Sequence, residues 1–231
     1  MKIAIIGAME EEVELIKNSL TDSHTEEYNK YTFYVGKYNN LELVVVVSKI
    51  GKVAAGMLSG TLFSNFEGIE KVINVGVSGG VSDFVTEGEV VVSEKLSYAD
   101  ADVTAFDYKF GQMAGLPLFY EGDQEMLGLI KSNCYKGVIL TGDSFQTDKK
   151  ETDAIINNYF PNEKVMCFDM ESTAFAQCAY MANIPFLAIR AISDVIGYNE
   201  NQKKRYDNAL EMACEKANNI LIEVLNGLST K

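Results

Sequence analysis

Acidic side chains, Arg190 and a single histidine are the first residues of this 231-residue chain to consider for catalysis. Glu12, Glu171 and Asp194 each lie close to the end of a short apolar run that is typical of a strand. His24, the only histidine, lies in a polar stretch that we interpret as an exposed loop. A Ser/His/Asp triad or a histidine zinc site would depend on that one residue. We therefore expect carboxylates to carry any acid–base catalysis.

The consecutive glutamates Glu10, Glu11 and Glu12 allow two interpretations. Negative charge in the first turn of a helix is favoured by the macrodipole by about a few tenths of a kcal/mol per residue. Successive helical residues are rotated by about 100°, so at most one or two of the three would face a ligand crevice. Glu171 lies in a stretch suited to burial, where an unpaired carboxylate is costly, although it too could be a helix-start charge.

Arg190 lies inside the apolar run 186–192. A guanidinium that projects from a core strand needs an anion, and a carboxylate in a crevice is the natural partner. Ser193 and Asp194 follow directly. They either face the same crevice or cap a following helix.

Three further residues and one glycine-rich segment lie near the predicted strand ends. Phe145 either stacks on a planar ring or caps the core, and Met9 and Met170 are more often core filler than ligand contacts. The segment 76–80 (GVSGG) allows close backbone approach to a ligand, but it lacks the GxGxxG spacing and the P-loop lysine.

Strands and helices alternate along the chain. Residues 97–117 have weaker periodicity and predict an irregular excursion. The alternation predicts an α/β fold in three layers, with a mixed, mostly parallel central sheet flanked by helices, as one domain over residues 1–231. Ligands of such sheets bind beyond the carboxyl ends of the strands, where the candidate residues lie. Strands are predicted at 3–8, 31–38, 41–48, 71–77, 89–93, 137–141, 164–167 and 186–192, and helices at 10–20, 51–66, 123–132, 149–159, 170–181 and about 204–225.

The charge balance bounds the partners. With 33 acidic and 20 basic side chains the formal net charge is −13, which repels phosphate backbones and anionic lipid, so we expect no nucleic acid and no membrane partner. The four cysteines form no CxxC pair, and the first apolar run leads into glutamates rather than a signal-peptide cleavage site. We expect a cytoplasmic protein with reduced thiols and a small-molecule partner.

Five segments in order resemble the nucleoside phosphorylase/nucleosidase superfamily, and within it the 5′-methylthioadenosine/S-adenosylhomocysteine nucleosidases. The resemblance runs from Met1 to about Leu225. The segments that carry it are 5–12 (IIGAMEEE), 51–55 (GKVAA), 101–106 (ADVTAF), 169–171 (DME) and 190–194 (RAISD).

This resemblance implies a hydrolase that releases adenine from a 5′-thio-substituted nucleoside, without metal or organic cofactor. Glu12 would activate the water with help from Arg190, and Asp194, supported by Ser193, would protonate adenine N7. The resemblance also implies a homodimer, in which the segment with Val103 and Phe106 covers the neighbouring pocket. Substrate-binding roles would fall to Met9, Ile50, Val77, Ser78, Gly79, Phe145, Gln146, Met170, Glu171 and Tyr206, with Tyr206 as the aromatic that closes over the base.

One residue departs from the family pattern. The family usually has a small hydroxyl residue directly after the glycine that corresponds to Gly76, whereas this chain has Val77 and then Ser78. Catalysis is altered if that hydroxyl touches water or sugar, unless Ser78 compensates.

Three other activities are compatible with the pattern. A purine nucleoside phosphorylase would use phosphate as nucleophile, but it needs cationic or hydroxyl groups where this chain has three glutamates. A futalosine-type hydrolase would use the same acid on another purine. A non-catalytic nucleoside-binding protein would be expected to lack at least one of Glu12, Glu171 and Asp194, and all three are present.

Overall fold

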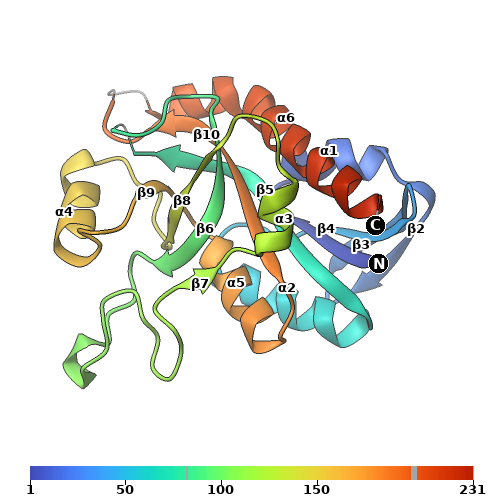
Figure 1. The fold of residues 1–231 in the computed structure, drawn as a ribbon, viewed down its shortest axis with the longest axis horizontal. Coiled ribbons are helices and arrows are strands. Elements are labelled where there is room, and N and C mark those ends of the chain that lie inside the picture. The colour runs from blue at the N-terminus through green and yellow to red at the C-terminus, as the bar shows by residue number, and fades with distance from the viewer. Residues whose placement is uncertain (82, 199–201, 231) are drawn as a thin grey trace.

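Residues 1–81, 83–198 and 202–230 are described by the computed structural model, and their ten strands form one sheet (Figure 1). The α-helices are α1 (Glu10–Asn18), α2 (Lys52–Asn65), α3 (Gln124–Leu129), α4 (Lys149–Tyr159), α5 (Ser172–Met181) and α6 (Gln202–Ser229), with a 3₁₀ turn at Thr104–Phe106. The strands are β1 (Lys2–Gly7), β2 (Thr21–Tyr28), β3 (Tyr31–Tyr38), β4 (Leu41–Val47), β5 (Ile69–Gly80), β6 (Val90–Tyr98), β7 (Tyr120–Glu121), β8 (Tyr135–Thr141), β9 (Val165–Asp169) and β10 (Phe186–Val195).

Part of the sheet closes on itself. The strand order β10-β6-β8-β9-β5, together with direct pairing of β10 with β5, makes a ring of five strands. From β5 the sheet continues outward through β1, β4, β3 and β2. The ring brings the carboxyl ends of β5, β9 and β10 together beside the end of β1.

The sheet is mixed, as predicted, but it is not mostly parallel. The pairs β1–β4, β1–β5, β5–β10, β6–β8 and β8–β9 are parallel. The pairs β2–β3, β3–β4, β5–β9, β6–β7 and β6–β10 are antiparallel. The difference arises partly because β2, β3 and β4 follow one another through tight turns, which allow only antiparallel pairing. The turn at Asn39-Asn40 has a positive φ of 54° at Asn39, as its sequence predicts.

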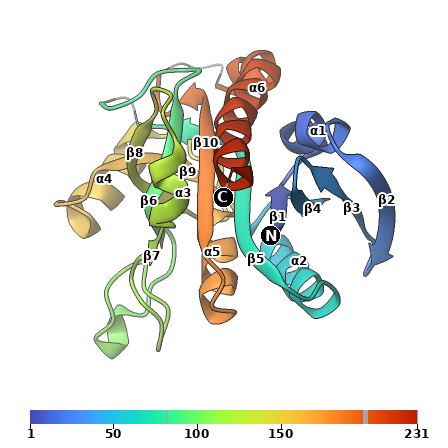
Figure 2. The same cartoon turned by 45° about the vertical axis from the view of Figure 1, so that its right-hand side comes forward.

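Helices cover both faces of the sheet (Figure 2). One buried cluster lies under α2 and α5, where Leu58, Leu62 and Phe175 pack against strand side chains. Another lies under α1 and α6, which contribute Ile16, Leu221 and other apolar residues. These two layers of helices hold the sheet from either side, so the predicted three-layer α/β architecture is confirmed.

The strand β2 is missing from the prediction, and the interpretation of His24 as a loop residue is wrong. His24 pairs with Val35 of β3, although its side chain is 60% exposed as expected. The sequence TDSHTEEY of β2 is polar throughout, and almost every side chain in it is exposed. An edge strand without a buried face gives no alternation of apolar and polar residues for the sequence to reveal.

Strand β10 contains a β-bulge. Its register with β5 runs from Phe186↔Val72 to Ile192↔Ser78 and then shifts, so that Asp194 pairs with Gly79. Ser193 is the extra residue. Ser193 and Asp194 therefore belong to the strand and do not cap a following helix.

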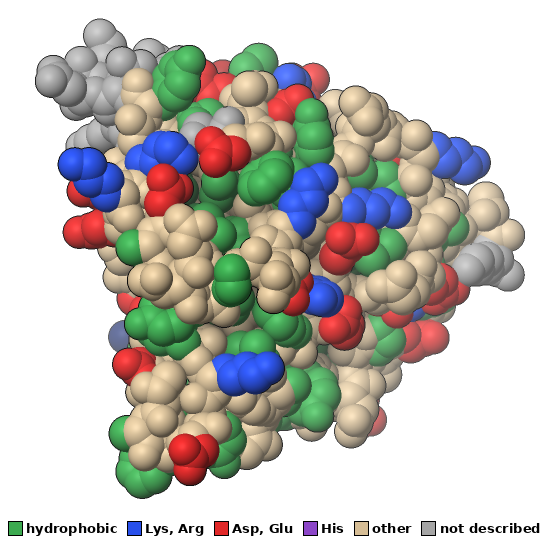
Figure 3. All heavy atoms as spheres, turned by 60° about the vertical axis from the view of Figure 1, so that its left-hand side comes forward, with side chains coloured by type: hydrophobic (Ala, Val, Ile, Leu, Met, Phe, Trp, Pro, Cys, Tyr) green, Lys and Arg blue, Asp and Glu red, His purple; other side chains and the backbone are tan. Residues whose placement is uncertain are grey.

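Two further features bear on partners. The four cysteines are free thiols, and no helix in the described ranges has the length and apolar character needed to cross a bilayer. On the face drawn in Figure 3, the Lys and Arg side chains of the described residues are interspersed with Asp and Glu rather than gathered into a basic stripe.

Candidate active site

A cavity of about 540 Å³ lies where β1, β5, β9 and β10 end. It brings together most of the residues that the sequence singled out. Its lining comprises Ala8, Met9, Glu12, Ile50, Val77, Ser78, Gly79, Ser144, Phe145, Gln146, Thr147, Phe168, Asp169, Met170, Glu171, Ser193, Asp194 and Tyr206. Of the predicted site residues, only Arg190, Val103 and Phe106 do not line it.

Glu12 is buried in the first turn of α1, with its side chain turned back over the end of β1. Its Oε2 accepts hydrogen bonds from the backbone N–H groups of Ala8 (2.6 Å) and Met9 (3.1 Å), and its Oε1 accepts one from Val77 (3.1 Å). Burial raises the pKa of Glu12, while Arg190 and these three N–H groups lower it. Such a carboxylate is a better proton acceptor than an exposed one and is held in one orientation.

Only Glu12 of the three glutamates faces the cavity. Glu10 and Glu11 are exposed, and Glu10 forms an ion pair with Lys17 at 2.9 Å. The helix-dipole interpretation therefore suits those two residues, and the crevice interpretation suits Glu12.

Gly76 makes room for the side chains around Glu12. A Cβ at this position would lie 2.5 Å from Glu12 Oε1 and 2.9 Å from Arg190 Nη1. Any larger residue would displace one of them. Gly76 thus leaves room for the side chains of Glu12 and Arg190. The residues that follow it in the glycine-rich segment, Val77, Ser78 and Gly79, line the cavity.

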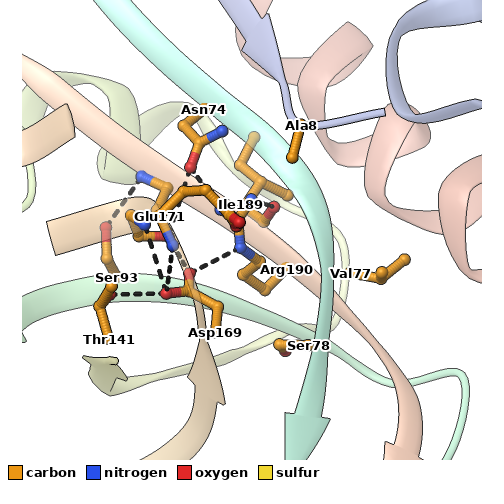
Figure 4. A network of polar contacts seen from close by, with 12 residues as sticks. Ala8, Asn74, Val77, Ser78, Ser93, Thr141, Asp169, Glu171, Ile189 and Arg190 are labelled. Atoms are coloured by element: carbon orange, nitrogen blue, oxygen red, sulfur yellow. Dashed lines mark hydrogen bonds and ion pairs between the residues drawn. The ribbon is translucent and has the colours of Figure 1, made fainter. Parts of the chain in front are cut away.

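Arg190 lies behind the cavity wall and is 2% exposed. Its Nε donates to Asp169 Oδ2 at 2.8 Å, and its Nη2 donates to Asn74 Oδ1 (Figure 4). Asn74 Nδ2 donates to the carbonyl of Ile6 in β1 at 2.8 Å. The anion that the sequence predicts for Arg190 is therefore Asp169. The side-chain amide of Asn74 connects the guanidinium to β1, the strand that precedes Glu12.

Asp169 and Asn74 were not among the predicted site residues. Asp169 also accepts from Thr141 Oγ1 at 2.6 Å and from Ser172 Oγ, so its two oxygens are fully used by the protein. The DME segment contained the signal for Asp169, because two carboxylates flank one methionine at a strand end. Asn74 had a weaker signal: it is the one polar residue in the apolar run 72–77.

Asp194 lies at the end of β10, is 1% exposed and lines the cavity. Ser193 Oγ donates to Asp194 Oδ1 at 2.7 Å and also lies 3.3 Å from the carbonyl of Ser78. A Cβ at Gly79 would lie 3.2 Å from Ile196 Cγ1, a tight contact, and 3.6 Å from Asp194 Oδ2, an ordinary one. The neighbouring serine thus holds one carboxyl oxygen of Asp194, a contact that agrees with what the resemblance implies for Ser193.

Glu171 precedes α5 and lines the cavity beside Met170. Its Oε1 accepts a hydrogen bond from the N–H of Gly51 at 2.8 Å. Burial, and then the charge of Asp169, raise the pKa of Glu171 to about 7, although Arg190 and the Gly51 N–H oppose the shift. This carboxyl therefore exchanges its proton near neutral pH.

The raised pKa of Glu171 predicts a dependence of stability on pH. Between pH 4.5 and about 7 the folded chain holds a proton on Glu171 that the unfolded chain releases, so its contribution to stability falls as the pH rises through that window. The free energy of unfolding of Glu171→Gln minus that of wild type should therefore increase between pH 5 and pH 8, by up to about 3 kcal/mol.

Urea unfolding at the two pH values measures this difference. Glu14→Gln, at an exposed position on α1, is the matched control and should behave as wild type at both. If the difference in stability between Glu171→Gln and wild type is the same at both pH values, the pKa of Glu171 is not raised by folding.

Aromatic and sulfur-containing side chains form another wall of the cavity. Tyr206 of α6 donates its hydroxyl to Met9 Sδ at 3.4 Å, and its ring meets that of Phe145 edge-on at 5.9 Å between centroids. Phe145 is 46% exposed. It therefore lines the cavity mouth rather than capping the core.

Val77 and Ser78 both line the cavity. Val77 serves Glu12 through its backbone N–H, so the missing hydroxyl does not leave that carboxylate oxygen without a donor.

Val103 and Phe106 lie away from the cavity of their own chain. Phe106 is 74% exposed, in the 3₁₀ turn of the excursion between β6 and β7.

The chain is similar to known proteins over its whole length. A model of the phosphorylase superfamily matches residues 2–226. A 5′-methylthioadenosine/S-adenosylhomocysteine nucleosidase of Listeria monocytogenes is 38% identical over 238 residues, which cover 97% of this chain and 99% of that protein.

Solved structures agree with these matches. The S-adenosylhomocysteine nucleosidase of Streptococcus pyogenes, in complex with 5-methylthiotubericidin, has a TM-score of 0.92 and 36% identity, covering 99% of this chain and 97% of its own. The nucleosidase of S. pneumoniae with the transition-state inhibitor MT-ImmA has a TM-score of 0.92 and 35% identity, covering 99% of this chain and 100% of its own.

Proposed function

Because the chain belongs to the 5′-methylthioadenosine/S-adenosylhomocysteine nucleosidases of the phosphorylase superfamily, we propose that it hydrolyses the N-glycosidic bond of these two nucleosides. The products are adenine and the 5-thio-substituted ribose, and 5′-deoxyadenosine is a further expected substrate. One observation carries the proposal: Glu12 and Asp194 come from different strand ends and line one cavity. The proposal treats residues 1–231 as one catalytic domain.

The reaction needs two opposed proton transfers. Glu12 takes a proton from water as the water oxygen bonds to C1′ of the sugar. The C1′–N9 bond breaks, its electron pair moves into the purine, and Asp194 gives its proton to N7. The proton on Glu12 then returns through solvent to Asp194, so the enzyme ends as it began.

The remaining cavity residues suit an uncharged nucleoside. In this proposal Glu171, which lines the cavity beside Met170, accepts hydrogen bonds from the ribose hydroxyls. Phe145 and Tyr206 offer faces and edges to the planar base, and the backbone at Phe145 and Gln146 is available for its polar edge. Met9 and Ile50 supply apolar contact for the sugar and the thio substituent.

Water is the better nucleophile for this cavity than phosphate. Glu12, the group beside the attacking nucleophile, is a carboxylate, and Arg190 is ion-paired with Asp169. A dianion would therefore meet a negative charge where a phosphorylase needs cations or hydroxyl groups. Val77, where the family usually has a hydroxyl residue, also offers no hydroxyl group to a phosphate.

Product analysis tests the proposed function. Methylthioadenosine, S-adenosylhomocysteine, 5′-deoxyadenosine and futalosine are each incubated with the protein, with and without phosphate. We expect adenine and the free thio-sugar from the first two at equal rates in both buffers. Release that requires phosphate would identify a phosphorylase, and recovery of intact ligand would identify a binding protein.

We also propose that the chain acts as a homodimer in the cytoplasm. The 74% exposed side chain of Phe106, in the 3₁₀ turn that follows Val103, supports this proposal, because in the homodimer this segment would cover the cavity of the second copy. Sedimentation equilibrium at assay concentration should give about twice the mass of the chain. A monomer with full activity would exclude this arrangement.

A further inference from the structure

An ion cluster lies outside the cavity, at the point where three chain segments meet. Lys52, the first residue of α2, places its Nζ 2.6 Å and 2.7 Å from the two carboxylate oxygens of Asp100. The same Nζ lies 3.7 Å from Asp143 Oδ2 and 5.4 Å from the centroid of the Tyr98 ring. We call Lys52, Asp100 and Asp143 the ion cluster.

Backbone hydrogen bonds connect the three segments further. The N–H of Lys52 donates to Asp143 Oδ1 at 2.8 Å, and the N–H of Asp143 donates to Asp100 Oδ2 at 2.9 Å. Asp100 lies just beyond β6, and Asp143 lies just beyond β8. The ion cluster therefore fastens the ends of two strands to the start of α2.

Two glycines leave room for the ion cluster. Gly51 has a φ of +99°, and a Cβ there would lie 3.2 Å from Asp143 Oδ1. A Cβ at Gly142 would lie 3.2 Å from Asp100 Oδ2. The backbone thus approaches both carboxylates more closely than other residue types allow without displacement.

Each segment that the ion cluster joins continues to the cavity or to the projecting turn. Gly51, directly before Lys52, donates its N–H to Glu171, and Ile50 lines the cavity. Residues 144–147, directly after Asp143, form the cavity wall that includes Phe145. From Asp100 the chain runs on to the turn at 104–106.

We propose that Lys52 is a positioning residue for the nucleoside, acting through Asp100 and Asp143. The inference rests on the proposed function and deepens it. Lys52 neutralises two carboxylates that lie side by side, and it thereby holds the Gly51 N–H against Glu171 and the 144–147 segment against the base. It touches no reacting atom, so it governs binding and leaves proton transfer unchanged.

The electrostatics give this role a distinctive signature. All three side chains are partly exposed, at 25%, 37% and 47%, so salt screens their interactions. In wild type, added salt weakens the attraction between Lys52 and the two carboxylates, so KM should rise. In Lys52→Met the two carboxylates repel each other, salt weakens that repulsion, and KM should fall.

The experiment measures kcat and KM for methylthioadenosine, which carries no net charge, between 0.05 and 1 M salt. At low salt, Lys52→Met is expected to raise KM about fivefold and to change kcat by less than about threefold, as for loss of a partly exposed ion pair at the upper end of the usual range. The double variant Lys52→Met/Asp100→Asn removes the repulsion and should recover most of the wild-type KM. Lys95→Met is the matched control, because Lys95 pairs with Glu163 at 3.1 Å outside the cavity lining.

The outcomes separate this inference from the proposed function. If wild type releases no adenine, the proposed function fails and the inference fails with it. If wild type is active but Lys52→Met has a KM within twofold of wild type, or the same direction of salt dependence, only the inference is overturned. Lack of recovery in the double variant would also overturn it, since general damage to the fold is not repaired by a second substitution.

Discussion

Replacing Glu12 with glutamine is expected to lower kcat for adenine release by about 10²–10⁴-fold, the usual contribution of a general base. Glutamine has nearly the same volume, but it cannot take a proton from water. Its amide oxygen can accept from the N–H groups of Ala8 and Met9, as Oε2 does, while its NH2 group then faces the N–H of Val77 and leaves that donor unpaired. KM should change little, because binding of the nucleoside does not depend on the proton transfer.

Steady-state and single-turnover assays of adenine release measure this effect, with thermal unfolding as a check on the fold. Glu11→Gln is the matched control, since Glu11 is the neighbouring glutamate on the same helical turn and is exposed. It should retain wild-type kcat. A folded Glu12→Gln variant with near-normal kcat would remove Glu12 from the mechanism.

The second large effect is expected for Asp194→Asn, which should also lower kcat by about 10²–10⁴-fold. Asparagine can still accept the hydrogen bond from Ser193 Oγ through its carbonyl oxygen, so the side chain should keep its place. It has no acidic proton to give to N7, and the purine must then leave as an anion.

A change of leaving group separates the two roles. In a nitrophenyl glycoside of methylthioribose, the leaving group is a nitrophenolate, which departs without protonation. Asp194→Asn should therefore cleave this compound almost as fast as wild type does. Glu12→Gln should remain slow on the same compound, because water still needs a base. If Asp194→Asn were equally impaired on both substrates, Asp194 would not be the acid. Asp153→Asn on α4, which removes a partly exposed carboxylate that pairs with Lys149, serves as the control.

Most of the fold could be predicted from the sequence, because its strands are apolar and its helices follow at regular intervals. Helix α4 has the predicted bounds, and the hairpin of β3 and β4 follows from its Asn-Asn turn. The failures have a physical cause. The strand β2 is polar on both faces, and β5 extends through Gly79 and Gly80, where glycine alone indicates a loop. Closure of the ring by β5 and β10 depends on long-range pairing that no local pattern encodes.

The cavity-lining residues could be predicted in large part, because strand ends and motif order both indicated them. Asp194 belongs to β10 and is thereby separated from its alternative as a helix cap. Glu12, in the first turn of α1, and Glu171, the N-cap of α5, do lie at helix starts, and only the structure reveals that they are also buried against the cavity. The sequence could not reveal that Asp169 is the partner of Arg190 or that Asn74 bridges β1 to it. Those contacts join residues far apart in the chain, and only the folded arrangement specifies them.

The extra residue in β10 lets one strand serve two sides of the sheet. Ala188 and Ile192 pack under α2 and α5, whereas Ile189 and Ala191 pack under α6, so alternation assigns Arg190 to the former side. In a regular strand Asp194, four residues after Arg190, would point to the same side as Arg190. Because Ser193 is an extra residue, Asp194 points to the opposite side. The buried cation and the proton donor thus lie on opposite faces of one strand, and Ser193, the residue that separates them in this way, also donates its hydroxyl to Asp194 Oδ1.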